Sequence, residues 1–267
     1  MSNKKNSNLI NNFEDPPVYF KGKPFWSWNG ELERDELIRQ TGIMQEMGFG
    51  GHFMHSRAGL ITEYLGDEWF EHINAVADES ERLGIEAWLY DEDRYPSGSA
   101  GGLVTKDPKY RCKSIVNHET TREFFAWSDN VYAAFVAKLD GNNLWSYKRI
   151  IPADDIDSLI FAENISVEDK SGDWTIIFYT KGPYPVNTNF NDGSPLDTIS
   201  REAVAKFIEV THEKYKEKCG NRLGRSIKGI FTDEPRRFDS IHFDFSNSRE
   251  RFASTCWTEE QIGRAHV

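Results

Sequence analysis

The sequence has few cysteines, no apolar leader and no long apolar run. Cys112, Cys219 and Cys256 are the only cysteines among 267 residues, and they share no metal-ligand spacing. An odd, sparse set of this kind is typical of a reducing compartment without structural disulfides. The start, from Met1 to Asn8, is polar and unlike a signal peptide. No apolar run approaches the roughly 20 residues that a membrane-spanning helix needs. We therefore expect a cytoplasmic protein without a membrane segment.

The chain has fewer basic than acidic side chains. The chain has 32 Lys and Arg against 43 Asp and Glu, which gives a net charge of −11 and a pI near 5.2. Nucleic acid and anionic membranes both require a basic face, so this balance argues against either as a partner. A neutral substrate is easier to reconcile with it.

Several catalytic and cofactor motifs are missing from the sequence. It has no nucleophilic Ser or Cys motif and no zinc spacing, and the run Gly98–Gly102 does not follow the GxGxxG pattern of a nucleotide-binding loop. Aromatic residues, in contrast, make up 13% of the chain and include eight Trp. Flat rings beside polar residues suit stacking on sugars, and ordinary core packing is an equal alternative.

Strand and helix patterns alternate over much of the chain. Short apolar runs predict strands at 24–30, 49–55, 86–90 and 227–232, and helical spacing predicts helices over 31–47, 67–83 and 200–218. Ser200 is the expected N-cap of the last helix, and Gly84 caps the second. Short links between alternating strands and helices predict right-handed crossovers and a parallel sheet.

The middle of the chain has a different pattern. Alternating runs and turns occupy residues 113 to about 184, and Asp140-Gly141 between two such runs is a hairpin signal. We therefore predict an α/β fold: the first half of a (β/α)8 (TIM) barrel with an antiparallel β insertion between strands three and four. The expected segments are a flexible lead-in at 1–17, strands one to three with helices at 18–112, the insertion at 113–195, a helix with a truncated strand four at 196–261, and a tail at 262–267.

The tail has an unusual sequence. Ile262-Gly-Arg-Ala-His-Val267 is what a sequencing-library adapter, ATC GGA AGA GCA CAC GTC, encodes in order. We therefore expect a chain that is cut short after residue 261, before a barrel could close. A natural tail with this sequence is the alternative.

Two strands end on carboxylates. The run Ile227–Thr232 stops at Asp233-Glu234, and Pro235 prevents its continuation as a ladder strand. Cleavage of a glycoside needs two carboxyl groups, one of them held protonated, and burial beside a like charge raises the pKa of a carboxyl. Glu234 and Asp233 are therefore candidate catalytic residues. The alternative is that the pair caps a helix or binds a neighbouring Arg.

The run Asp91-Glu92-Asp93 ends the strand at 86–90 in the same way. On an extended backbone Asp91 and Asp93 face one way and Glu92 the other, and Arg94 can pair with one of them. Such a cluster suits sugar hydroxyls or a hard cation such as calcium. Solvated loop acids are the alternative. Because parallel strands open their carboxyl ends onto one site, we expect Asp91 and Glu234 to share a face.

Further candidates for substrate binding lie at the ends of the first two strands. Trp26, Trp28 and Asn29 could form a platform for a sugar, although core packing is at least as good an explanation for one of the two Trp. His55, followed by Ser56 and Arg57, suits hydrogen bonding to substrate. A metal shared by His52 and His55 is disfavoured, because strand residues three apart point to opposite faces.

A set of short motifs resembles bacterial glycoside hydrolase-like proteins related to family 106, the α-L-rhamnosidases. The motifs are Pro24-Phe-Trp-Ser-Trp-Asn-Gly30, Gly48-Phe-Gly-Gly51, Tyr64-Leu-Gly-Asp-Glu-Trp69, Leu89-Tyr-Asp-Glu-Asp93 with Pro96-Ser-Gly98, and Phe231-Thr-Asp-Glu-Pro235. The similarity runs from about residue 18 to 240, interrupted by the insertion. It implies a (β/α)8 catalytic barrel, an inverting mechanism with two carboxylates, calcium dependence and a carbohydrate partner.

Carried over to this chain, the resemblance assigns Glu234 as the general acid and puts the base on a later strand. Asp233 stands where many retaining barrel glycosidases carry Asn, which leaves the stereochemical outcome and the sugar open. The chain as given is therefore expected to be an inactive part of a glycosidase. The rival interpretations are a non-catalytic carbohydrate-binding barrel and a metal-dependent barrel lyase or isomerase with its metal on Asp91 and Asp93.

Overall fold

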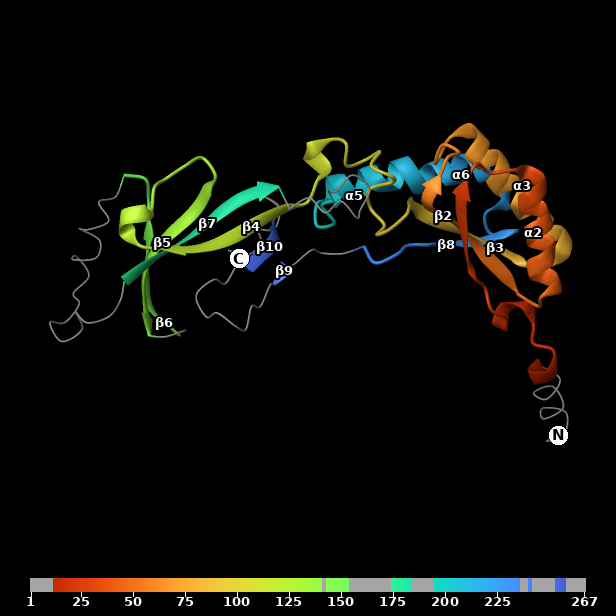
Figure 1. Ribbon diagram of the computed structural model, residues 1–267, viewed down its shortest axis with the longest axis horizontal. Helices are drawn as coiled ribbons and strands as arrows, with labels where there is room; N and C mark the ends of the chain where they lie inside the picture. The colour runs from red at the N-terminus through yellow and green to blue at the C-terminus, as the bar shows by residue number, and fades with distance from the viewer. Residues whose placement is uncertain are drawn as a thin grey trace. The chain divides into compact units, whose positions relative to one another are not determined.

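A computed structural model describes residues 12–140, 143–153, 174–183, 195–235, 240–241 and 253–257. The chain divides into two compact units, Met1–Tyr110 with Val186–Arg236, and Arg111–Pro185 with Arg237–Val267. Each unit has its own sheet (Figure 1). No helix in the described ranges has the length and apolar character that crossing a membrane requires. The expected adapter-derived tail, 262–267, lies outside the described residues.

The first unit contains a four-stranded parallel sheet. Its order is β1 (Phe25–Gly30), β2 (Gly51–Leu60), β3 (Glu86–Asp93) and β8 (Ile227–Phe231). Each neighbouring pair is parallel, as the alternation of strand and helix patterns predicts. Most residues in the range 51–56 of β2 and in β3 are buried, which is usual for strands of a parallel sheet that helices cover.

Helices alternate with these strands. α2 (Arg34–Glu46) follows β1, and α3 (Asp67–Leu83) follows β2. The helical stretch before β8 has three parts: α5 (Arg201–Ile208), a π-helical turn η6 (Glu209–Glu213) and α6 (Lys214–Cys219). Two predicted caps are confirmed: the Ser200 side chain accepts a hydrogen bond from the Ala203 N–H, and Gly84 ends α3 in the left-handed conformation.

The main core lies between this sheet and its helices. Trp28, Met54 and Leu89 from the strands pack in one cluster with helix residues such as Trp69 and Tyr215. Two glycines let the backbone approach closely. A Cβ on Gly50 would lie 2.3 Å from the Val18 carbonyl oxygen, and one on Gly51 would lie 2.2 Å from that of Glu86. Neither position can therefore hold a larger residue without a backbone shift.

The second unit is built on a six-stranded antiparallel sheet. Its order is β6 (Asn143–Ile150), β5 (Val131–Asp140), β7 (Trp174–Pro183), β4 (Lys113–Thr120), β10 (Ala253–Trp257) and β9 (Ser240–Ile241). The antiparallel hairpin of β5 and β6 confirms the turn signal between them. Ala134, Val136, Ile150 and Ile176 form a small core beside Phe125.

The predicted half barrel with an insertion between strands three and four is wrong. The described residues form an open four-stranded parallel sheet, a separate six-stranded antiparallel sheet and four α-helices. The antiparallel sheet is not an insertion, because β9 and β10 follow β8 in the chain and β10 pairs with β4. Residue periodicity indicates strands but not their partners, and the short pattern after Pro235 predicts no strand at all.

Candidate functional site

The pairing of β3 with β8 brings two sets of carboxylates to one edge of the parallel sheet. Leu89 lies opposite Ile230 and Tyr90 opposite Phe231. Asp91 and the segment Thr232-Asp233-Glu234 therefore follow directly at the carboxyl ends of the two strands. This confirms the expectation that these strands are parallel neighbours. In open α/β sheets such an edge is where ligands commonly bind.

Asp91 is fully buried and joins three segments. Its Oδ1 accepts a hydrogen bond from the Ser97 hydroxyl at 2.6 Å, and its Oδ2 accepts one from the Thr232 hydroxyl at 2.6 Å. The His212 Nε2 lies 3.3 Å from the same Oδ2. Because both carboxylate oxygens have partners within the chain, Asp91 organises the site and is not open to a ligand.

His212 is a residue of this site that the sequence reasoning missed. It belongs to the π-helical turn η6, where the Thr211 hydroxyl donates to the Phe207 carbonyl oxygen at 2.7 Å. A π turn is a rare interruption of a helix and often occurs at functional sites. Here it places His212 beside Asp91 with 30% of its side chain exposed. The helical periodicity of the sequence gives no signal for the extra residue of such a turn.

Glu92 holds the loop that follows β3. Its Oε2 accepts hydrogen bonds from the backbone N–H groups of Gly98 and Ala100, and its Oε1 accepts from those of Asp93 and Gly101. The side chain is fully buried, which raises its pKa to about 8, while the four backbone donors favour the ionised form. This predicted substrate-binding residue therefore lies inside the loop and faces no ligand.

Asp233 is held by Tyr90 and by the same loop. The Tyr90 hydroxyl lies 2.8 Å from Asp233 Oδ2 and 3.1 Å from the Arg94 carbonyl oxygen. The Asp233 N–H donates to the Ser97 hydroxyl oxygen, and the Ser97 N–H donates to the Asp233 carbonyl oxygen. Burial and then the bond to Asp233 raise the pKa of Tyr90, so this phenol remains a donor at neutral pH.

Glu234 is the exposed carboxylate of this edge. Its side chain accepts a hydrogen bond from the Tyr95 hydroxyl. Its backbone φ is +41°, in the left-handed region that few residues other than glycine adopt. Such strained positions concentrate at functional sites. The sequence identifies Glu234, but nothing in its pattern predicts the strained backbone or the contact with Tyr95.

His55, which is buried, and Arg57 and Arg94, which are exposed, lie near this edge. His55 is 3% exposed and packs against Tyr90 with ring centroids 3.6 Å apart. Burial first, and then the charge of Arg57, lowers the pKa of His55 to about 4, so the ring is neutral at physiological pH. Arg57 and Arg94 are exposed, and Arg94 Nε lies 3.6 Å from Asp93 Oδ2, which is one of the pairings predicted for it.

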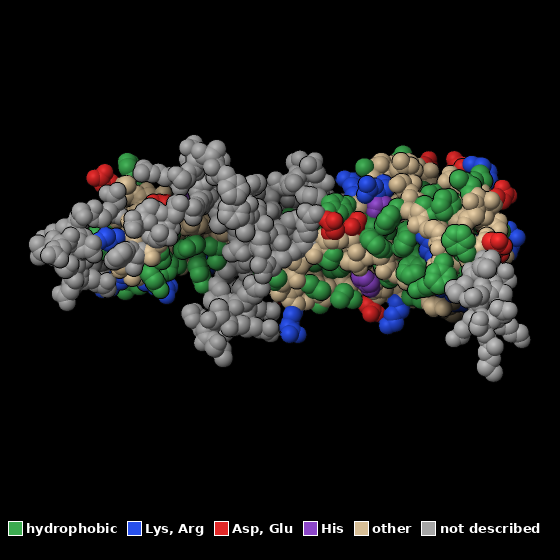
Figure 2. Space-filling view, turned by 90° about the horizontal axis from the view of Figure 1, so that it is seen from below, with side chains coloured by type: hydrophobic (Ala, Val, Ile, Leu, Met, Phe, Trp, Pro, Cys, Tyr) green, Lys and Arg blue, Asp and Glu red, His purple; other side chains and the backbone are tan. Residues whose placement is uncertain are grey.

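The face of the sheet that carries His55 and Tyr90 also carries phenylalanines. Phe25 stacks on Phe53 with centroids 5.0 Å apart and meets Phe231 edge-on at 5.0 Å. Phe25 is 52% exposed. Figure 2 shows hydrophobic side chains gathered on the surface of the unit that contains this sheet. Exposed rings beside polar groups offer flat stacking surfaces for a ligand.

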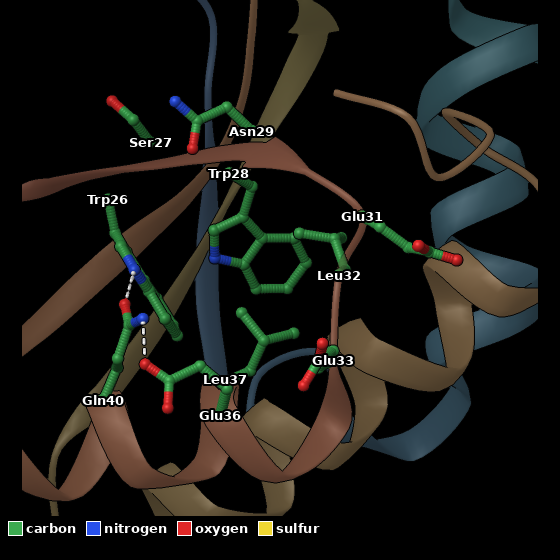
Figure 3. Close-up of a pocket in the computed structure, with 10 residues that line it drawn as sticks. All are labelled: Trp26, Ser27, Trp28, Asn29, Glu31, Leu32, Glu33, Glu36, Leu37 and Gln40. Atoms are coloured by element: carbon green, nitrogen blue, oxygen red, sulfur yellow. Dashed lines mark hydrogen bonds between the residues drawn. The ribbon is translucent and has the colours of Figure 1, made fainter. Parts of the chain in front are cut away.

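Trp26 and Trp28 do not join this face. Both side chains point toward α2, whereas Ser27 and Asn29 point the other way (Figure 3). Trp28 is 1% exposed and packs edge-on against Trp69 of α3, which is the core role that the sequence left open for one of the pair. Trp26 is half-buried, and its indole N–H donates to Gln40 Oε1 at 2.8 Å.

The calcium ion that the resemblance implies does not fit Asp91, Glu92 and Asp93. The oxygens of Asp91 and Glu92 already accept hydrogen bonds from the chain, and the Ser56 hydroxyl donates to Asp93 Oδ1. Across the described residues, no group of three or more His, Cys, Asp or Glu is arranged to hold a metal. His52 and His55 are likewise not arranged as a metal pair, since His52 Nε2 lies 3.0 Å from the Ser80 hydroxyl.

Comparison with known proteins gives a structural likeness. No protein-family model and no curated protein sequence matches the chain. A solved structure, a rhamnosidase from Novosphingobium sp. PP1Y, matches with a TM-score of 0.52 and 14% sequence identity. The match covers 84% of this chain and 39% of that protein. The chain thus shares a fold with part of the rhamnosidase and spans less than half of its length.

Proposed function

We propose that this chain belongs to a carbohydrate-active protein of the glycoside hydrolase type. It would bind a glycoside at the carboxyl ends of β3 and β8, and Glu234 would donate a proton to the glycosidic oxygen. The observation that carries the proposal is the exposed Glu234 carboxylate, held by Tyr95 at an edge that Asp91, Asp233 and His212 organise. The rhamnosidase fold likeness makes an α-L-rhamnoside the first substrate class to test.

The roles of the neighbouring residues follow from their contacts. Asp91 and Glu92 fix the loop between Ser97 and Gly102, so they position the site and do not take part in the chemistry. Asp233 is oriented by Tyr90 and sets the backbone that presents Glu234. His55, neutral and beside Tyr90, would support the aromatic face on which a sugar ring could lie.

Hydrolysis also requires a second carboxylate on the far side of the scissile bond, roughly 5 to 10 Å from the acid. Asp91 and Glu92 are engaged inside the chain, and Asp233 is adjacent to Glu234 in sequence. The carboxylates described at this edge therefore supply an acid but leave the base unassigned. The inactivity expected for the chain as given stays a prediction, and ligand binding is the more direct test of the role of Glu234.

The test compares two ligands that differ at the glycosidic atom and at the ring oxygen, which is a carbon atom in the second ligand. Methyl α-L-rhamnopyranoside has the ordinary glycosidic oxygen, and a rhamno-configured carbasugar amine carries a protonated nitrogen in its place. If Glu234 faces that atom, its carboxylate pairs with the nitrogen, and the amine binds more tightly than the glycoside. Glu234→Gln should reduce this preference by roughly tenfold, the size of a modest charge-pair contribution at an interface. Titration calorimetry measures both affinities.

Glu71→Gln is the matched control, because Glu71 is an exposed carboxylate on α3 away from this edge. It should leave the preference unchanged. Binding of both ligands with no effect of Glu234→Gln would favour the non-catalytic carbohydrate-binding alternative. Turnover of an aryl rhamnoside that survives Glu234→Gln would contradict the assignment of Glu234 as the acid.

A further inference from the structure

The π-helical turn η6 holds a histidine whose two ring nitrogens both face oxygen atoms. His212 Nδ1 lies 3.0 Å from the Thr211 hydroxyl oxygen, and His212 Nε2 lies 3.3 Å from Asp91 Oδ2. Thr211 and Asp91 are fully buried, while 30% of the His212 side chain is exposed. The ring therefore lies between the buried carboxylate and solvent, and its two neighbours determine where its hydrogens are.

The Thr211 hydroxyl fixes the hydrogen on the first nitrogen. Its oxygen lies 2.7 Å from the Phe207 carbonyl oxygen, which can only accept, so the hydroxyl hydrogen points at Phe207. A hydroxyl has one hydrogen, so the Thr211 oxygen can only accept from His212. Nδ1 of His212 therefore carries a hydrogen and donates it to Thr211.

Asp91 fixes the hydrogen on the second nitrogen. Its Oδ1 accepts from the Ser97 hydroxyl and its Oδ2 from the Thr232 hydroxyl, both at 2.6 Å, and such donors favour an ionised carboxylate. A His212 Nε2 without a hydrogen would place its partial negative charge 3.3 Å from this carboxylate, which is repulsive. Nε2 therefore carries a hydrogen as well, and His212 faces Asp91 as a cation.

Asp91 in turn holds the segment that contains the candidate acid. Thr232, whose hydroxyl donates to Asp91, directly precedes Asp233 and Glu234. The Ser97 hydroxyl donates to the other Asp91 oxygen and accepts from the Asp233 N–H at 2.8 Å. Loss of one partner of a buried ion pair leaves an uncompensated charge, which is strongly destabilising. The cation beside Asp91 therefore affects the backbone that presents Glu234.

We propose that His212 is a positioning residue of the candidate site. With a hydrogen on each ring nitrogen it compensates the charge of Asp91, and Asp91 fixes the segment that presents Glu234. His212 does not transfer a proton itself, because both of its nitrogens are engaged within the chain. Its effect on a ligand rests on the function proposed above, whereas its hydrogens and its hold on the segment can be measured without a ligand.

The first measurement reads the hydrogens of the ring. The chain has seven histidines, and a long-range ¹H–¹⁵N correlation spectrum of histidine-labelled protein reports both ring nitrogens of each. His212→Gln identifies the signals of His212. At neutral pH both nitrogens of His212 should have the chemical shift of a protonated nitrogen. A His212 Nε2 with the shift of a nitrogen that lacks a hydrogen would overturn the proposal.

Hydrogen exchange measures the hold on the segment. His212→Gln keeps a donor and removes the charge, so the Asp233 N–H should exchange at least about tenfold faster, the scale of one lost hydrogen bond to a charged group. The Glu86 N–H, which donates to the Gly50 carbonyl oxygen at the start of β3, should keep its rate. A general loss of stability would accelerate both amides. That result, or an unchanged rate for Asp233, would overturn the proposal.

The ligand measurement uses the glycoside and the carbasugar amine described above. His212→Gln should reduce the preference for the amine at least about threefold, part of the roughly tenfold loss expected for Glu234→Gln. Lys216→Gln is the control, since it removes an exposed cation of α6 that lies 3.3 Å from Glu213, and it should change neither the preference nor the exchange rates. A preference that His212→Gln leaves intact would overturn the proposal. If the unmodified chain shows no preference, the proposed function fails, and the two measurements without ligand still decide the role of His212.

Discussion

At the scale of single residues, the buried carboxylates act as structural anchors. Glu92 accepts four backbone N–H groups, and Asp91 accepts two hydroxyl groups from different segments. Buried polar groups are stable only when such bonds are complete. The sequence predicts a ligand site at this acidic cluster. The carboxylates of Asp91 and Glu92 instead accept hydrogen bonds from the chain and hold the loop that follows β3.

Glu92→Gln tests this role. An amide keeps one acceptor oxygen and replaces the other by a donor, so two of the four backbone N–H groups lose their acceptor. We expect the free energy of unfolding to fall by about 2–6 kcal/mol, from 1–3 kcal/mol for each of the two buried donors left unpaired. Urea denaturation at pH 9, where Glu92 with its pKa of about 8 is ionised, measures the change. Glu71→Gln on the surface of α3 serves as the control with little effect. A fall of less than 1 kcal/mol would mean that the four bonds do not anchor the loop.

His52 gives a pH-dependent prediction. The Ser80 hydroxyl donates to the Val76 carbonyl oxygen, so its oxygen accepts from His52, which fixes the proton of the neutral ring on Nε2. Burial lowers the pKa of His52 from 6.5 to about 4. Between these values the unfolded chain binds a proton that the folded chain does not. Stability from His52 is therefore complete above pH 6.5 and is lost as the pH falls toward 4.

The comparison of wild type with His52→Gln isolates this contribution. The difference in unfolding free energy should shrink with falling pH across that window, by on the order of 3 kcal/mol in total. Glu92 has a raised pKa and acts with the opposite sign, but it is present in both proteins and cancels. A difference that stays constant with pH would show that the ring is already charged in the folded state or is open to water.

At the scale of elements, α6 is tied to the parallel sheet by one hydroxyl group. The Trp69 indole N–H donates to the Tyr215 oxygen at 3.2 Å, and the Tyr215 hydroxyl donates to the Tyr90 carbonyl oxygen at 3.3 Å. These two hydrogen bonds link α3, α6 and β3 next to the candidate site. It lies directly beside the π turn that places His212.

Tyr215→Phe removes this link and keeps the ring. It leaves a buried donor and a buried acceptor unpaired, so we expect a loss of about 2–4 kcal/mol in unfolding free energy. Tyr19→Phe is the control, since Tyr19 is 73% exposed, and it should have little effect. Thermal unfolding followed by circular dichroism would detect the difference. Equal midpoints for the two variants would contradict the bridging role.

The sequence predicts elements of this molecule better than their partners. Periodicity indicates the parallel strands, the main helices and the hairpin of β5 and β6, and the Asp-Glu runs indicate the edge where β3 and β8 end. It does not reveal β10, because pairing with β4 depends on residues far apart in the chain. It also misses the π turn, and it leaves open which of Trp26 and Trp28 lies in the core, which packing against α3 decides.

At the scale of the whole molecule, two sheets of different kinds come from interleaved parts of the chain. The unit with the parallel sheet holds every carboxylate of the candidate site. The proposed carbohydrate function therefore rests on this unit. The antiparallel unit has its own core around Ala134 and Ile176, and no role in ligand binding is assigned to it.

A crystal structure of the chain with the rhamno-configured carbasugar amine tests directly whether Glu234 faces the glycosidic atom. We expect the ligand to lie at the carboxyl ends of β3 and β8, with its protonated nitrogen about 3 Å from a carboxylate oxygen of Glu234, the distance of a charge-assisted hydrogen bond. A ligand found only elsewhere on the molecule, or bound at the edge with its nitrogen turned away from Glu234, would contradict the assignment of Glu234 as the proton donor.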